Sequence, residues 1–300
     1  MSILLETNLP LPLLHRGKVR DNYELGDKLL IVASDRISAF DVVLPCGIPD
    51  KGAVLNLISA FWFAKTAHIL PNHLLEVVKD TAQLNAYAPQ KNGFPAGLVN
   101  RSMIVRKAKR IPIECVVRGY LSGSAWAEYS SKGTVNGAGM RPGMRESERF
   151  PEAIFTPTTK AESGHDQPLS LEGMAELVGQ VLTEELREKT LAVYRFAEEY
   201  TRTKGIIIAD TKMEFGVVDG KVILIDELLT PDSSRFWDAG KYMVGRSQPS
   251  YDKQMVRDWL TASGWNKEPP APMLPEDLIR KTSQRYQEAY RILTGSSLYH

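Results

Sequence analysis

The sequence predicts an α+β fold with two lobes. Short apolar runs typical of strands dominate the first third of the chain, whereas long helical patterns come late. The strand–helix alternation of a Rossmann fold is missing, and no G-x-G-x-x-G turn follows a strand. A chain of 300 residues is long enough for one large domain or two modest ones.

The early strands are marked by their turns. Gly26-Asp27 is a turn signal between two strand-like runs, and Pro71 stops a helical pattern that precedes it. We therefore expect strands at 19–25, 28–33, 102–105 and 113–117, and a helix at 53–69.

The middle of the chain, residues 130–168, is rich in Gly, Pro, Ser and Thr and has little periodicity, which predicts a long functional or mobile loop. After it, Ser170 can N-cap a helix, and the helical pattern continues, with a break near Gly179, to a stop at Gly205.

The last third begins with strands and ends with helices. Asp219-Gly220 is a strong hairpin signal between two apolar runs. We expect strands at 205–209, 215–218 and 222–225, then a helix at 251–263 capped by Ser250 and a helix at 276–293 between Pro275 and Gly295.

Composition and charge limit the classes of partner. The chain has 37 Lys and Arg against 36 Asp and Glu, a net charge of +1, so local basic residues must hold any anionic ligand. The basic run 106–110 has no interleaved aromatic residue, which favours a solvated connection over a nucleic-acid patch. No apolar run or leader pattern indicates a membrane span or signal peptide. We expect a cytoplasmic monomer or small homo-oligomer with small-molecule substrates, and neither nucleic acid nor membrane as a partner.

Several catalytic classes are disfavoured by the sequence. Cys46 and Cys115 are in no C-x-x-C pair, which excludes a disulfide scaffold and a cysteine zinc site. The five histidines show no metal-ligand spacing, and no G-x-S-x-G elbow is present. A hydrolase with a covalent intermediate is therefore not expected.

The densest group of charges lies around the predicted hairpin. Asp210, Lys212 and Glu214 alternate, so an extended segment places them on one face. Asp226 follows the next apolar run, at a strand end where one or two carboxylates often hold magnesium together with phosphates and water. The spacing alone leaves a solvated acidic strand end as an equal alternative.

The hairpin register gives this hypothesis a structural test. A strict two-residue turn places Glu214 opposite Ile225, which turns Asp226 to the other face. If both carboxylates bind one metal ion, we expect a bulge or a loop one residue longer or shorter.

Three further segments are candidates for binding anions. Lys18 and Arg20 precede a strand, beside a single glycine, but the segment is not a Walker A loop. Arg118 to Ser124 combines glycines and hydroxyls after a strand, and Arg235 can fork onto a phosphate or carboxylate. Ordinary surface turns and ion pairs are the alternative for each segment.

Together these strings resemble the SAICAR synthetase family, the phosphoribosylaminoimidazole-succinocarboxamide synthases of purine biosynthesis. The matches keep the family's order and span residues 17–257, and they are far more specific together than any one motif. The matching stretches are Gly17–Asp21 with Tyr23, Ser34–Asp41, Glu114–Ser124, Asp210–Gly216 and Asp226–Asp238.

The resemblance implies a fold and a reaction. The fold is a two-lobed, ATP-grasp-like architecture, with the nucleotide between a strand-rich lobe of residues 1–110 and a larger lobe of residues 111–300. The enzyme would be a carbon–nitrogen ligase that uses ATP as co-substrate with Mg²⁺. It would join L-aspartate to the carboxylate of an aminoimidazole ribonucleotide, through an acyl phosphate.

The resemblance also implies roles for individual residues. Lys212 and Asp210 would be catalytic. ATP and its magnesium would be held by Lys18, Arg20, Lys160, Glu162, Glu214 and Asp226, of which Glu214 and Asp226 are the metal ligands. The ribonucleotide would contact Arg118, Ser124, Asp210, Lys212, Arg235 and Arg257.

Other interpretations stay open at this point. No spacing argument fixes the aspartate site, although we look for it near Ser34–Asp41. A two-lobed small-molecule kinase also fits an Asp-x-Lys before a hairpin and a second acidic residue, although His-Arg-Asp and Asp-Phe-Gly are absent. A nucleotide-binding module without catalysis is the third class.

Overall fold

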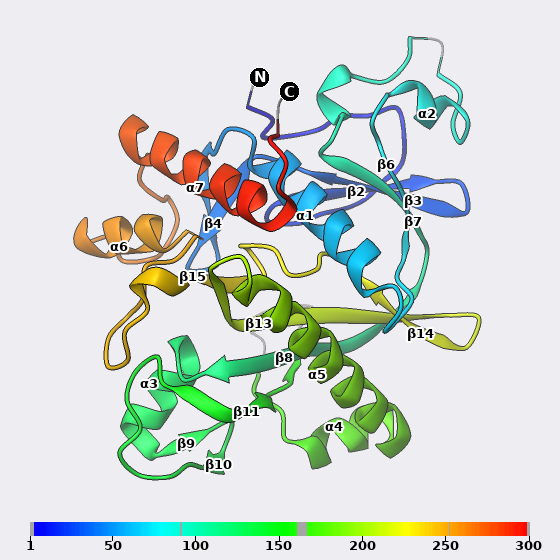
Figure 1. Ribbon diagram of the computed structural model, residues 1–300. Helices are drawn as coiled ribbons and strands as arrows, with labels where there is room; N and C mark the ends of the chain where they lie inside the picture. Colours follow the sequence, from blue (N-terminus) through cyan, green and yellow to red (C-terminus); the bar gives the residue numbers. More distant parts are fainter. Residues whose placement is uncertain (1–2, 91, 161–166, 252, 299–300) are drawn as a thin grey trace.

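Two large antiparallel sheets organise the chain (Figure 1). The computed structural model describes residues 3–90, 92–160, 167–251 and 253–298. The first sheet has the order β1 (Leu13–Arg16), β2 (Arg20–Leu25), β3 (Lys28–Ala33), β7 (Ser102–Arg106) and β6 (Leu74–Val77). The second has the order β11 (Arg149–Phe155), β8 (Lys109–Tyr120), β13 (Ile206–Val218) and β14 (Lys221–Ile225), while β12 (Thr158–Thr159) pairs with β8 and β15 (Ser234–Asp238) with β13.

The long helices cover these sheets. In Figure 1, α1 (Lys51–Thr66) lies against the first sheet and the C-terminal helix α7 (Glu276–Thr294) packs on α1, while α5 (Gln180–Arg202) crosses the second sheet beside α4 (Leu171–Val178). The remaining elements are short: β4 (Arg36–Ala39), β5 (Val42–Gly47), α2 (Ala82–Asn85), α3 (Gly123–Lys132), β9 (Thr134–Val135), β10 (Ala138–Gly139), α6 (Gln254–Ala262) and 3₁₀ turns at Ala96–Leu98 and Ala239–Lys241.

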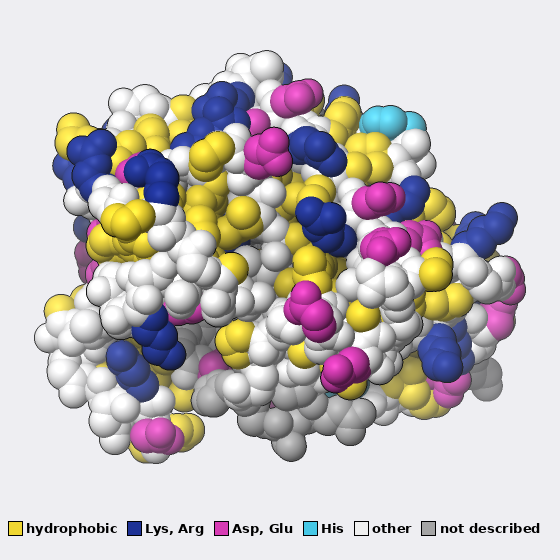
Figure 2. Space-filling model, turned by 90° about the horizontal axis from the view of Figure 1, so that it is seen from below, with side chains coloured by type: hydrophobic (Ala, Val, Ile, Leu, Met, Phe, Trp, Pro, Cys, Tyr) yellow, Lys and Arg dark blue, Asp and Glu magenta, His cyan; other side chains and the backbone are white. Residues whose placement is uncertain are grey.

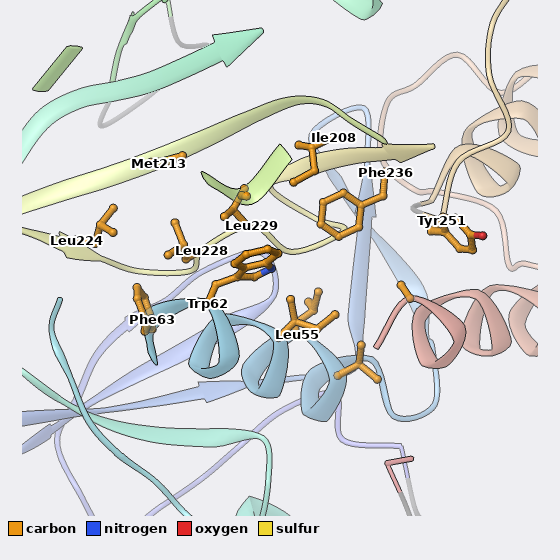
Figure 3. Close-up of a cluster of buried hydrophobic side chains, with 14 of the residues drawn as sticks. Leu55, Trp62, Phe63, Ile208, Met213, Leu224, Leu228, Leu229, Phe236 and Tyr251 are labelled. Atoms are coloured by element: carbon orange, nitrogen blue, oxygen red, sulfur yellow. The ribbon is translucent and has the colours of Figure 1, made fainter. Parts of the chain in front are cut away.

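One hydrophobic cluster joins α1 to the second sheet (Figure 3). Trp62 and Phe63 of α1 lie in this cluster with Leu224 of β14 and with Leu228 and Leu229, all of them buried. Burying side chains of this size stabilises the packing by about 1.5–3 kcal/mol each. The cluster therefore fixes the segment that follows β14, which begins with the acidic pair at 226–227.

Local sequence signals placed several boundaries correctly. The Asp219-Gly220 hairpin is present, with Val218 paired to Lys221. The Ser170 hydroxyl accepts a hydrogen bond of 3.0 Å from the backbone N–H of Gly173, as an N-cap does. Gly295 adopts φ 73° directly after α7, which is the left-handed C-terminal stop that the sequence predicts.

The long loop at 130–168 was a wrong prediction, because β9 to β12 lie within it. Strand β11 pairs with β8 at the edge of the sheet, and its register shifts between Arg149 and Ile154. An edge strand with an irregular register does not need the apolar alternation by which strands are recognised. The sequence therefore gives no periodic signal there.

Three other predicted boundaries also need correction. The strands expected at 205–209 and 215–218 form one continuous strand, β13, because the charged residues between them pair with β8. Helix α1 begins and ends earlier than expected. Helix α6 begins at Gln254, since Ser250 donates a hydrogen bond to the Phe236 carbonyl instead of capping a helix.

The surface carries both signs of charge. On the face seen in Figure 2, basic and acidic side chains are interspersed, and neither covers it. The basic run 106–110 is largely exposed and extends from the last residue of β7 through a two-residue link into the start of β8, as expected for a solvated connection. Among the helices of the described residues, none has the length and apolar character needed to cross a membrane. The division after residue 110 stays a prediction.

Candidate active site

The register of β8 against β13 creates one charged face. Asp210 lies opposite Arg118, and Glu214 lies opposite Glu114. Because side chains alternate along both strands, Asp210, Lys212 and Glu214 share their face with these two partners. The alternation in the sequence predicted the three residues of β13 correctly.

At one end of this face, two guanidinium groups meet one carboxylate. Asp210 is buried and accepts a hydrogen bond of 3.0 Å from Arg118 and a second, short one from Arg235. Arg118 also donates to the Ser124 hydroxyl at 3.2 Å. Gly123 leaves the room that Arg235 occupies, since a Cβ there would collide with the guanidinium. One carboxylate against two cations leaves this end positively charged, which suits an anionic substrate group.

A cavity of about 720 Å³ lies at this end. Ser124, Arg235 and Arg257 line it, so three residues from distant parts of the chain meet there. Residues 38–41 form another part of the wall. The volume is that of a small-molecule site, and the basic side chains suit the phosphate of a nucleotide.

At the other end of the face, two lysines and two glutamates alternate. Lys212 donates to Glu114 at 2.9 Å, and Lys160 donates to Glu114 at 2.6 Å and to Glu214 at 2.7 Å. Burial alone would raise the pKa of Glu114, but the charges of Lys212 and Lys160 hold it below the ordinary value. Burial and then the charge of Asp226 raise the pKa of Glu214, against the effect of Lys160.

The predicted irregularity in the hairpin is wrong. Glu214 lies opposite Ile225 in a regular two-residue hairpin, so no bulge turns Asp226 toward it. Instead, Asp226 follows the last residue of β14 and adopts φ 65°, which takes it out of the strand alternation. Its charge raises the pKa of Glu214, so the two carboxyl groups lie within electrostatic range of each other.

The N-terminal basic segment reaches the same end. Arg20 donates to Asp226 at 2.9 Å and to Glu227 at 3.0 Å, which joins β2 to the segment after β14. Lys18 is about half exposed and pairs with Asp41 at 2.5 Å. Asp41 lines the cavity at the opposite end, so the structure places Arg20 beside the carboxylates, whereas a place for Lys18 in the same site stays a prediction.

The carboxylates fit a magnesium ion. Glu214 and Asp226 offer oxygen ligands and are partly exposed, with 14% and 28% of their side chains accessible. Within the described residues, no group of three or more His, Cys, Asp or Glu side chains is arranged to hold a metal. A magnesium ion there would take its other ligands from phosphate and water, as this ion commonly does.

Two expectations about the site stay predictions. Glu162 lies outside the described residues, so its role stays a prediction. The segment Ser34–Asp41 contributes only its second half to the cavity wall, and an aspartate site there also stays a prediction.

Sequence reasoning missed a buried ion cluster beneath the site. The Lys51 ammonium is fully buried and contacts Asp232 at 2.7 Å, while the Tyr286 hydroxyl donates to the same carboxylate at 2.6 Å. Burial would raise the pKa of Asp232, but Lys253 and Lys51 hold it well below its ordinary value. These contacts tie α1 and α7 to the segment that carries Arg235, and no local pattern in the sequence signals them.

We expect Tyr286→Phe to lower the free energy of unfolding at pH 7 by about 1.5–3 kcal/mol, because a hydrogen bond to a buried charge is lost. The ring stays beneath Lys51, 5.6 Å from its ammonium. The folded pKa of Asp232 is depressed, so its stabilisation is complete above the ordinary value of 3.8 and is lost as pH falls below it. Urea unfolding should show the variant and the parent converging in strong acid; a constant difference would contradict the assignment.

Comparisons with known proteins show the family of this chain. The SAICAR synthetase family model matches residues 13–272. Phosphoribosylaminoimidazole-succinocarboxamide synthases of Thermodesulfovibrio yellowstonii and Geobacter sulfurreducens are 52% and 51% identical, covering 98% of this chain and 99% and 98% of theirs. A Saccharomyces cerevisiae SAICAR synthase solved with SAICAR is 45% identical, with a TM-score of 0.90 over 99% of this chain and 100% of that one. The chain belongs to the SAICAR synthetase family, the ATP-dependent ligases that join L-aspartate to a carboxyaminoimidazole ribonucleotide in purine biosynthesis.

Proposed function

We propose that this ligase works in two steps, both on the face formed by β8 and β13. First, the ribonucleotide carboxylate attacks the γ-phosphorus of ATP, giving an acyl phosphate and ADP. Second, the amine of L-aspartate attacks the acyl carbon, and phosphate leaves with the bonding electrons as the amine loses a proton. The first step is needed because oxide is a poor leaving group, whereas phosphate is a good one.

The observation that carries this proposal is the position of Lys212. A strand rises about 3.3 Å per residue, so Lys212 lies about 7 Å along β13 from Asp210 and from Glu214. Asp210 accepts a hydrogen bond from Arg235, which lines the cavity, and Glu214 lies within electrostatic range of Asp226. A phosphoryl group moving between ligands bound at the two ends would pass the Lys212 ammonium.

The two ends would divide the work. Arg118, Arg235 and Arg257 would hold the anionic groups of the ribonucleotide, with Asp210 fixing the first two guanidinium groups. Ser124 would contribute a hydroxyl to the same ligand. The 45% identical yeast enzyme was solved in complex with SAICAR, which supports a site for this ribonucleotide within the shared fold.

The carboxylate end would receive the triphosphate. Arg20 and Lys160 lie at this end and would offer their charge to its oxygens. Lys18 and Glu162 would join them there. A magnesium ion held by Glu214 and Asp226 would supply charge neutralisation and orientation. Phosphoryl transfer asks little covalent chemistry of a protein, so positioning and charge are what these residues provide.

The dependence of phosphate release on each substrate tests the proposal. Phosphate release should need ATP, the ribonucleotide carboxylate and L-aspartate together. ADP formation that needs no amine and leaves a stable phosphorylated product would indicate a kinase instead. Absence of any turnover under all conditions would indicate a binding module.

We expect Arg235→Lys to raise the KM for the ribonucleotide about tenfold and to change the KM for ATP less than twofold. A lysine keeps the charge but loses the planar fork that can hold Asp210 and a substrate anion together. Steady-state kinetics with each substrate varied in turn measures both values. Equal increases in the two KM values would contradict the assignment of Arg235 to the ribonucleotide.

A cytoplasmic location and a monomeric or small homo-oligomeric state stay predictions from the sequence.

A further inference from the structure

The backbone of the loop that carries Lys18 is held by two side chains from one short segment. The Gly17 carbonyl accepts a hydrogen bond of 3.0 Å from Arg36, and the Lys18 carbonyl accepts one of 3.1 Å from the same guanidinium. The next carbonyl, of Val19, accepts from both the hydroxyl and the backbone N–H of Ser34, each at 2.9 Å. Three consecutive carbonyls are thus bound by Ser34 and Arg36.

Arg36 is itself immobilised by other partners. Its residue is 7% exposed, and its guanidinium also donates to the Leu5 carbonyl at 2.5 Å and to the Asp21 carboxylate at 2.7 Å. Asp21 is fully buried and accepts a further hydrogen bond from the Thr7 hydroxyl at 2.6 Å. With four acceptors around one planar fork, the guanidinium has a single orientation.

This arrangement has a consequence for a phosphate ligand. Phosphate oxygens are attracted by N–H groups and ammonium groups and repelled by carbonyl oxygens. Carbonyls that already accept hydrogen bonds from Ser34 and Arg36 point toward those donors. The loop can then present the side chains of Lys18 and Arg20 to a triphosphate without turning its carbonyls to it.

We propose that Arg36 is a positioning residue for the phosphates of ATP, which acts by fixing the backbone from Gly17 to Val19. The inference rests on the proposed role of Lys18 at the triphosphate. It gives a function to the buried start of the Ser34–Asp41 segment, whose end lines the cavity. The same segment thus contacts the phosphate loop and the ribonucleotide cavity.

Direct nucleotide binding to the full-length protein tests this proposal. Arg36→Lys keeps the charge beside Asp21 but cannot hold both loop carbonyls in one plane. We expect it to weaken ATP binding about tenfold and adenosine binding less than twofold, measured by calorimetry or displacement. The ratio of the two dissociation constants is the readout, because a general loss of structure would weaken both ligands.

Arg101→Lys is the matched control. Arg101 is 3% exposed and pairs at 2.9 Å with the carboxylate of Asp35, the neighbour of Arg36. Neither residue belongs to the loop that carries Lys18. This substitution should leave the ratio of ATP to adenosine affinity unchanged. A ratio changed equally by Arg101→Lys and Arg36→Lys would overturn the proposal.

Lys18→Ala separates this inference from the function on which it rests. If Lys18→Ala weakens ATP binding and Arg36→Lys does not, the positioning role is wrong and the ATP site stands. If neither variant weakens ATP binding, the loop is not at the triphosphate and both proposals fail. If Arg36→Lys does not fold, Ser34→Ala replaces it as the test, because this substitution removes only one hydroxyl from the Val19 carbonyl. We expect it to change the ratio of ATP to adenosine affinity about threefold. An unchanged ratio would overturn the proposal.

Discussion

Replacing Lys212 with methionine should lower kcat about 10²- to 10³-fold, with smaller changes in the KM of either substrate. Methionine keeps most of the length and volume of lysine but removes the charge. In the mechanism that we propose, negative charge develops beside the Lys212 ammonium as the phosphoryl group transfers. Phosphate release at saturating substrates measures the effect.

Folding should survive this substitution, because Glu114 keeps its hydrogen bond to Lys160 at 2.6 Å. Lys221→Met is the control: Lys221 is exposed at the start of β14, opposite Val218 near the tip of the same hairpin and about 13 Å along the strands from Glu214. It should leave kcat unchanged. An unchanged kcat in Lys212→Met, with a raised KM for the ribonucleotide, would limit Lys212 to substrate binding.

Glu214→Gln should lower kcat/KM for ATP at least about 100-fold and raise the Mg²⁺ concentration needed for half-maximal activity. Glutamine keeps the shape of the side chain, but its neutral amide is a weak ligand for a hard cation. Burial raises the pKa of Glu214, so its charge is costly in the fold. The variant should therefore unfold at the same or a higher temperature than the parent while losing activity.

Asp219→Asn is the companion control for this substitution. Asp219 lies at the tip of the same hairpin with φ 51°, a conformation that asparagine tolerates. Its activity and Mg²⁺ requirement should match those of the parent. Full activity of Glu214→Gln at the usual Mg²⁺ concentration would mean that the metal is held elsewhere.

The parts of the fold that the sequence predicted are those with local causes. The hairpin at Asp219-Gly220 follows from two residues that accept positive φ, and the break at Gly179 follows from one. Strand β11 was missed because its stability comes from pairing with β8, which no local pattern encodes. The start of α6 was misplaced because Ser250 has its partner in β15, outside the helix that it was expected to cap.

The same distinction applies to the site. The alternation of Asp210, Lys212 and Glu214 was readable because a strand repeats every two residues. Glu114 was not assigned a role, because its contact with Lys212 spans 98 residues. The approach of Asp226 to Glu214 depends on the left-handed backbone conformation of Asp226 itself. Aspartate adopts this conformation only occasionally, so the sequence predicts it weakly.

Isotope transfer tests the central claim, that the chain activates the ribonucleotide carboxylate by phosphorylation, most directly. The ribonucleotide is prepared with ¹⁸O in its carboxylate and turned over with ATP, Mg²⁺ and L-aspartate, and the released phosphate is analysed by mass spectrometry. An acyl phosphate predicts that each phosphate carries one oxygen from the carboxylate. Phosphate that contains no ¹⁸O, formed while SAICAR accumulates, would contradict it.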